Sequence, residues 1–205
     1  MSEFENFSLF LPRYLSPDTE NTLLADLKDF PGNIDKRMYG FYGKSDTVIY
    51  QGDGLKGLPY INFPEPRIES LSCLVLSNTC DVDPSNQRKF GSSIVYSPVI
   101  ALEKYEKLLL DKGIFSSVAL QAHVGAIRRQ EITQIFYLPS YSTDLPESIV
   151  FLDRLCHCDS TFVLRDELST RRLFSLSQYG LYLFLYKLSI HFTRFHEKID
   201  RTYRQ

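Results

Sequence analysis

The side chains with the clearest chemical potential lie where an apolar run, residues 72–76, ends. The next five residues, 77–81, are a cluster of small polar, thiol and carboxylate groups. A strand that ends in this way fixes the position of a reactive group while the loop exposes it. A cysteine nucleophile needs a neighbouring cation or histidine, whereas a carboxylate favours the protonated thiol. Cys80 and Asp81 are candidate catalytic residues because of their place at the end of the strand, although Asp81 alone would oppose formation of the thiolate. The alternative is a small thiol that fills space in the core and a carboxylate that caps the following turn.

A base for Cys80 would have to come from a distant part of the chain. The histidines are His123, His157, His191 and His196. Each could serve only if the fold brings it close to the thiol.

Two metal sites are conceivable from the residue types. Zinc could use Cys73, Cys80, Cys156, His157 and Cys158, but the spacing of 156 to 158 is tighter than that of paired zinc ligands, and 73 to 80 is wider. On a strand, the cysteines at 156 and 158 would share one face and the histidine would lie on the other. We expect two ordinary strand cysteines.

Carboxylates offer the second metal alternative. Asp53, Asp81 and Asp83 could supply the hard oxygen ligands that Mg²⁺ prefers. Residues 83–86 also form an ordinary turn sequence. We predict no bound metal and no cofactor.

Composition narrows the class of protein. The 205 residues are 43% hydrophobic and 14% aromatic, which is typical of a globular chain. The four cysteines are few for a secreted protein of this length, so we expect reduced thiols and a cytoplasmic location. The first residues lack the pattern of a signal peptide, and no apolar run reaches the ~20 residues of a membrane span.

Charge argues against a strongly basic nucleic-acid binder. The formal net charge is −2, whereas non-specific binding to nucleic acid usually needs a clear positive excess. Two local basic features remain, Arg88-Lys89 in the loop after Cys80 and Arg128-Arg129 on an expected helix. A solvated surface explains them equally well.

The elements that would position these residues are short strands and amphipathic helices. Apolar runs bounded by turn residues predict strands over 47–50, 72–76, 93–100, 134–139, 148–153 and 162–164. A Gly-Asp turn at 51–54 and a proline-rich extended connection follow the first of these. Helical spacing predicts helices from Ser16-Pro17 to about 31–33, over 102–113 and 115–129, and from a cap at Ser177 to near Lys198.

This pattern predicts an α+β fold with a small SH3-like curled sheet or barrel. Residues 1–45 would form an N-terminal arm and helix. Residues 46–165 would form the barrel, with a helical insertion at 102–129. Residues 166–205 would form a long C-terminal helix packed on the barrel.

The order of the motifs over roughly residues 50–155 resembles the MazF/PemK-type toxins. The shared features are a turn at Gly52-Asp53, a strand ending in Ser77-Asn78, and a later strand ending in a proline. The end of the 72–76 strand also resembles a Thr-Cys-Asp signature of uncharacterised bacterial proteins, found in mobile or defence-related gene clusters. The helical insertion and the first 45 residues have no counterpart in the compact toxins.

The resemblance implies a face that binds RNA beside the Gly-Asp turn. Arg67, Ser77, Asn78, Thr79 and Arg88 would contact phosphates or position a 2′-hydroxyl, and Lys89 would add to the same basic loop. For RNA cleavage, Arg67 would be the cation that meets the developing charge. No base accompanies it in the sequence.

The sequence therefore predicts a non-catalytic interaction module of a bacterial defence or toxin–antitoxin system. Its partner would be RNA or DNA, or a protein encoded nearby, and a homodimer is one possible assembly. The alternatives are a MazF-like endoribonuclease toxin and a cysteine-dependent hydrolase.

Overall fold

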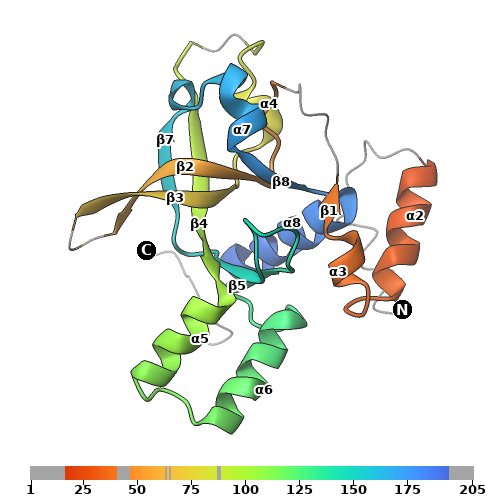
Figure 1. Cartoon of the computed structure of the whole chain (residues 1–205). Coiled ribbons are helices and arrows are strands. Elements are labelled where there is room, and N and C mark those ends of the chain that lie inside the picture. Colours follow the sequence, from red (N-terminus) through yellow and green to blue (C-terminus); the bar gives the residue numbers. More distant parts are fainter. Residues whose placement is uncertain (1–16, 41–46, 63, 65, 87–88, 194–205) are drawn as a thin grey trace, which may run out of the picture.

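The computed structural model describes residues 17–40, 47–62, 64, 66–86 and 89–193, and it has an α+β architecture (Figure 1). The strands form one antiparallel, eight-stranded sheet that is not closed. Their order is β1 (Tyr39–Gly40), β8 (Arg172–Leu176), β2 (Asp53–Asn62), β3 (Arg67–Val75), β4 (Ser93–Ala101), β6 (Ser148–Phe151) and β5 (Ile135–Leu138), and β7 (Cys156–Asp159) also pairs with β4.

The helices surround this sheet. They are α2 (Pro17–Lys28), α3 (Ile34–Arg37), α4 (Thr79–Val82), α5 (Leu102–Asp111), α6 (Ser117–Arg128), α7 (Leu168–Arg171) and α8 (Gln178–Thr193), with short 3₁₀ turns η2 (Ser160–Phe162) and η3 (Arg165–Glu167). Figure 1 shows α5 and α6 as a helical hairpin at one end of the molecule, with α4 and α7 at the other. Within the described residues, the helices are too short or too polar to cross a membrane.

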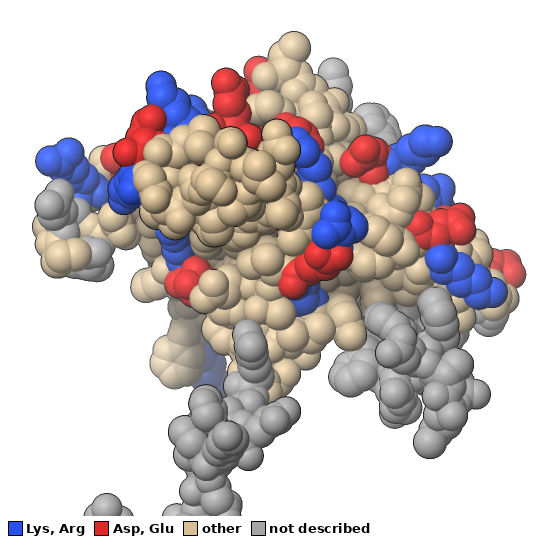
Figure 2. Space-filling view, turned by 90° about the horizontal axis from the view of Figure 1, so that it is seen from below, with Lys and Arg blue, Asp and Glu red and all other residues tan. Residues whose placement is uncertain are grey.

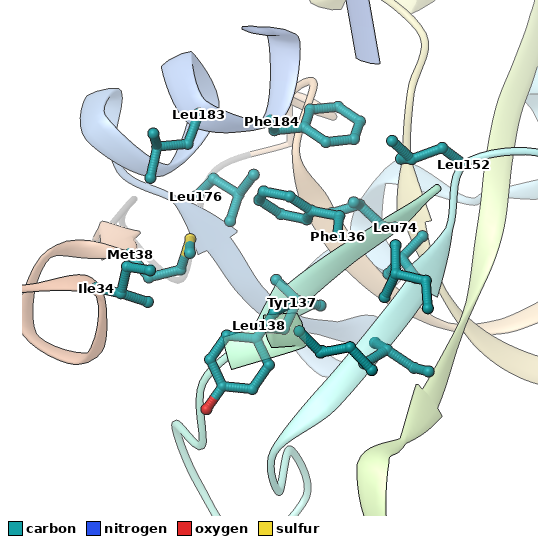
Figure 3. Close-up of a cluster of buried hydrophobic side chains, with 14 of the residues drawn as sticks. Ile34, Met38, Leu74, Phe136, Tyr137, Leu138, Leu152, Leu176, Leu183 and Phe184 are labelled. Carbon is teal, nitrogen blue, oxygen red and sulfur yellow. The ribbon is translucent and has the colours of Figure 1, made fainter. Parts of the chain in front are cut away.

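Strand β3 separates two hydrophobic clusters. Its side chains alternate between the faces of the sheet, so Leu74 is buried in one cluster while Cys73 and Val75 are buried in the other. In the larger cluster, Phe136 of β5 packs on Phe184 of α8 with ring centroids 5.3 Å apart, beside residues of α3 and β8 (Figure 3). The smaller cluster lies among β2, β3, β4 and α7.

Strand β4 pairs with two different strands along one edge. Its first half pairs with β7 at 93–96, and its last residues pair with β6 at 99–101. Ser97 and Pro98 lie between these two ladders. A proline is tolerated there because its missing N–H falls at a break in the pairing, and the Ser97 hydroxyl spans the break by donating to the Phe151 carbonyl at 2.7 Å.

A buried carboxylate holds the turn that begins β2. Asp53 is fully buried, and it accepts hydrogen bonds from the Tyr50 amide at 2.9 Å, from Arg172 Nε at 3.1 Å and from the Ser175 hydroxyl. Burial raises the pKa of Asp53, and the Ser175 hydrogen bond and the Arg172 charge oppose that shift. The Arg172 guanidinium also donates to the Val48 carbonyl, so one ion pair joins β8 to the segment before β2.

Most of the predicted elements are confirmed. Strands lie within or near the predicted ranges 72–76, 93–100, 134–139 and 148–153, and the two helices of the 102–129 insertion are present. The cap at Ser177 is confirmed, because its hydroxyl accepts from the Gly180 amide at 3.0 Å. The N-terminal arm and the region near Lys198 lie outside the described residues.

Two of the predicted strands are wrong, and three strands were not predicted. Residues 47–50 are not a strand; Ile49 is buried in a coil, and the strand begins at Asp53 and runs through Pro59. Residues 162–164 are not a strand, since a 3₁₀ turn ends at Phe162. Strands β1, β7 and β8 were not predicted. The α+β class is confirmed, whereas the open sheet does not confirm an SH3-like barrel.

The buried ion pair yields a stability prediction. Changing Arg172 to Met leaves the Asp53 carboxylate buried without its counter-charge, so we expect the free energy of unfolding to fall by about 3–5 kcal/mol. The loss should shrink as the pH falls, because protonation of Asp53 removes the uncompensated charge. Urea unfolding at two pH values measures both effects.

The matched control is Lys56→Met, which breaks an exposed pair with Asp144 (2.6 Å). Exposed pairs contribute about 0–1 kcal/mol. Equal losses in the two variants would show that burial of the Asp53–Arg172 pair has no special weight.

Candidate functional site

The polar residues after β3 begin the short helix α4. Asn78 is its N-cap, with an extended backbone and a side-chain oxygen that accepts from the Cys80 amide at 2.9 Å. Asparagine is among the preferred N-cap residues because it satisfies an amide that has no partner within the helix. The Asn78 side chain therefore has a structural task.

Ser77 and Thr79 brace this helix against neighbouring segments. The Ser77 hydroxyl accepts from the Val95 amide at 2.8 Å and donates to the Ser93 carbonyl at 3.3 Å. The Thr79 hydroxyl accepts from the Gln51 amide at 3.0 Å, next to the Asp53 turn. These side chains were predicted to contact a ligand, and each of them joins two parts of the fold.

Cys80 and Asp81 are exposed on α4. The Cys80 thiol is free, and its backbone carbonyl accepts from the Asn86 side chain at 2.5 Å. Among the described histidines, none is hydrogen-bonded to Cys80. His123 bonds to the Tyr105 hydroxyl at 3.1 Å, His157 lies on β7 and His191 on α8; His196 lies outside the described residues.

The structure does not bring Arg67 to this site. Arg67 begins β3 and pairs with Asn62 at the tip of the β2–β3 hairpin, which projects from the rest of the sheet in Figure 1. Ser77 follows the opposite end of β3, and that end lies roughly 26 Å from Arg67 along the strand. Arg88 lies outside the described residues, and Lys89 is exposed in the loop after α4.

The candidate metal ligands do not form a metal site in the part of the chain that the structure describes. Within the described part of the chain, no three His, Cys, Asp or Glu side chains form a metal-binding group. Cys156 and Cys158 pack toward the smaller cluster and His157 is exposed, in the alternation that the sequence predicted. Burial raises the pKa of the nearby Cys73 to about 12. Asp53 is already bound to Arg172.

The basic pair on α6 is neutralised. Arg128 Nε lies 2.8 Å from a Glu147 carboxylate oxygen, and Arg129 Nε lies 2.7 Å from one of Glu131. Figure 2, which views the molecule from the side of α5 and α6, shows lysines and arginines interspersed with acidic residues. Among the residues that the structure describes, that face shows no separate patch of positive charge.

An open groove lies beside α4. We call it the α4 groove; its volume is about 490 Å³. It lies between the loop after α4 and the η2–η3 segment, and its lining is Asp83, Pro84, Asn86, Phe90, Ser92, Ser160, Thr161, Val163, Leu164 and Arg165. Phe90 is 85% exposed and Leu164 is 52% exposed, so the groove presents apolar surface to solvent.

Arg165 has unused donor capacity in this groove. Its Nη2 donates to the Val82 carbonyl at 2.6 Å, whereas Nη1 is buried and has no hydrogen-bond acceptor in the described structure. Asp83 lies close enough to interact electrostatically, and hydrogen bonds from Ser85 lower the pKa of Asp83. The groove therefore combines one cation, one anion and exposed apolar side chains.

Sequence reasoning missed Phe90 and Arg165. An aromatic residue within the polar loop 83–91 was the available signal for Phe90. Arg165 had no such signal, because its contact with Val82 joins residues far apart in the chain.

The comparisons with known proteins add no relative. No protein-family model matches the sequence, and no curated protein matches it at a significant level.

The hydrogen bonds of the 77–81 segment yield a second prediction. Changing Ser77 to Ala leaves the Val95 amide without its acceptor, so we expect a loss of about 1–2 kcal/mol in the free energy of unfolding. Changing Cys80 to Ala removes an exposed thiol, and the expected change is within about 0.5 kcal/mol. Urea unfolding of the two variants measures both free energies of unfolding. A Ser77→Ala protein as stable as the unaltered chain would contradict the structural role of the Ser77 hydroxyl.

Proposed function

We propose that this chain is a non-catalytic protein-binding module whose α4 groove receives an extended segment of a partner protein. The observation that carries the proposal is Phe90, 85% exposed at the edge of a groove of about 490 Å³. Exposed aromatic surface beside a concavity marks interaction sites more often than ordinary surface does.

The groove chemistry suits a peptide with an apolar side chain and a free acceptor. Phe90 and Leu164 offer apolar contacts to that side chain. A backbone carbonyl of the partner could satisfy the unused donor of Arg165 after a small rotation of the guanidinium. The hydroxyls of Ser92 and Ser160, which also line the groove, are hydrogen-bonded to each other at 2.7 Å.

Balanced charge favours a protein over a nucleic acid. Arg165 is offset by Asp83 within the groove, and the whole chain is slightly acidic. Nucleic-acid grooves instead follow the phosphate backbone with an excess of Lys and Arg. The exposed Cys80 has no histidine partner in the described structure, which supports a non-catalytic role.

The finer expectations stay predictions. These are the SH3-like barrel relationship, the bacterial defence or toxin–antitoxin context, homodimer formation, and the endoribonuclease and hydrolase alternatives. A cytoplasmic location stays a prediction as well.

Selection from a displayed library of random short peptides tests the proposal. The full chain is the target, and Phe90→Asp serves as the counter-selection. We expect an enriched peptide to bind Phe90→Asp at least about tenfold more weakly than the unaltered chain, because a charge replaces the apolar contact. Hydrogen exchange should show protection of residues 83–92 and 159–165 in the complex.

The matched control is Val118→Asp, a change at a site that is 76% exposed on α6, and it should bind like the unaltered chain. Enrichment that is equal on the target and on Phe90→Asp would contradict the proposal.

Mixed-sequence RNA and single-stranded DNA, tested with and without Mg²⁺, form the second arm of the experiment. Cleavage would overturn the non-catalytic assignment, and salt-sensitive binding lost in Phe90→Asp would identify a nucleic-acid module instead.

A further inference from the structure

A second cavity, distinct from the α4 groove, lies between α2, α8 and the connection from α6 to β5. Its volume is about 260 Å³, roughly nine water volumes. Leu27, Phe30, Leu183 and Ile190 supply apolar walls. Small-molecule sites are usually apolar concavities of about 300–1,000 Å³ with a few polar groups, so this cavity has the usual lining and lies just below that size range.

The polar group of this cavity is a buried lysine. Lys187 is only 6% exposed, and its Nζ donates to the Gln130 carbonyl at 3.0 Å and to Gln130 Oε1 at 2.7 Å. An ammonium group has three N–H donors, so these two bonds leave one donor. Lysine is rarely buried without a carboxylate partner, and the described cavity lining contains Lys28 as a second cation and no acidic residue.

Gln130 holds the lysine in place at some conformational cost. It has a positive φ of 62° at the end of α6, where glycine is usual. Its backbone N–H donates to the Ile127 carbonyl at 2.8 Å in the turn that ends the helix. Its side chain donates to the Tyr137 carbonyl at 2.7 Å and accepts from the Tyr137 amide at 3.1 Å. Glycine would end the helix as well but could not make these bonds, so the side chain pre-organises Lys187.

We propose that this cavity binds a small apolar monocarboxylate, with its hydrocarbon body between α2 and α8 and its carboxylate on the third N–H of Lys187. The apolar walls match the body of such a ligand. Lys28 and Lys187, with no acidic residue in the lining, suit a carboxylate group. A hydrogen bond between an ammonium and a carboxylate is stronger than one between neutral groups. A neutral or cationic ligand would leave the buried ammonium uncompensated.

Binding should be coupled to proton uptake. Burial lowers the pKa of Lys187 to about 7, and a bound carboxylate stabilises the protonated amine. Affinity should therefore fall as the pH rises above that value, because the neutral amine has only the two N–H groups that Gln130 already uses. The other titratable groups of the lining are Lys28 and Tyr186, and the neighbouring Glu131 is paired with Arg129.

Calorimetric titration of the full chain with octanoate, octanol and octylammonium tests this assignment. We expect octanoate to bind at least about tenfold more tightly than octanol at about pH 6, and octylammonium not to bind. The preference for octanoate over octanol should diminish toward about pH 9, with proton uptake on binding near neutral pH.

Lys187→Met should abolish the preference for octanoate while leaving apolar binding. Lys107→Met, an exposed lysine of α5, is the matched control and should retain the preference. The pH series uses the unaltered protein, so it remains decisive if Lys187→Met does not fold. Failure of octanoate to bind, equal binding of octanoate and octanol, or an affinity independent of pH would each overturn the proposal.

Discussion

The contact on which the rest of the structure depends is the buried ion pair between Asp53 and Arg172. It joins the start of β2 to β8, across 119 residues of chain. The Gln51 amide next to that turn bonds to Thr79, and Thr79 begins α4. Hydrogen bonds therefore connect the charge pair, through the turn, to the helix beside the α4 groove. A buried pair contributes more to the choice of one arrangement than to net stability, because the attraction is offset by desolvation.

Local patterns explain which elements could be predicted from the sequence. Helices α5 and α6 have apolar spacing, α5 has a clear end at Gly113, and β4 and β6 are rich in Ile and Val. Strand β8 was not predicted because Arg172 and Ser175 interrupt its apolar residues and leave no apolar run. Ser175 is buried and the Arg172 side chain is only 10% exposed, because both bond to Asp53, a partner that no local pattern identifies. Residues 47–50 were mistaken for a strand for the converse reason, since Ile49 is buried without belonging to a ladder.

The sequence drew attention to residues 77–81, but it could not show what their side chains do in the fold. A cluster of Ser, Asn and Thr after a strand is equally typical of a ligand-binding loop and of a helix cap, and here the hydrogen bonds of Ser77 and Asn78 are internal. The sequence could not show that Arg67 lies far from residues 77–81. The predicted strand began at residue 72, whereas β3 begins at Arg67. Phe90 and Lys187 matter through exposure and burial, respectively, and both are properties of the assembled fold.

The two hydrophobic clusters share one wall, since consecutive residues of β3 supply both. If the packing of one cluster were lost, β3 would no longer be held in place for the other cluster. The two clusters are therefore expected to unfold cooperatively and not as independent units. Any molecule that binds only the folded chain then stabilises both clusters together. Occupants of the α4 groove and of the cavity at Lys187 would thus share a single folding equilibrium, although they lie against different parts of the structure.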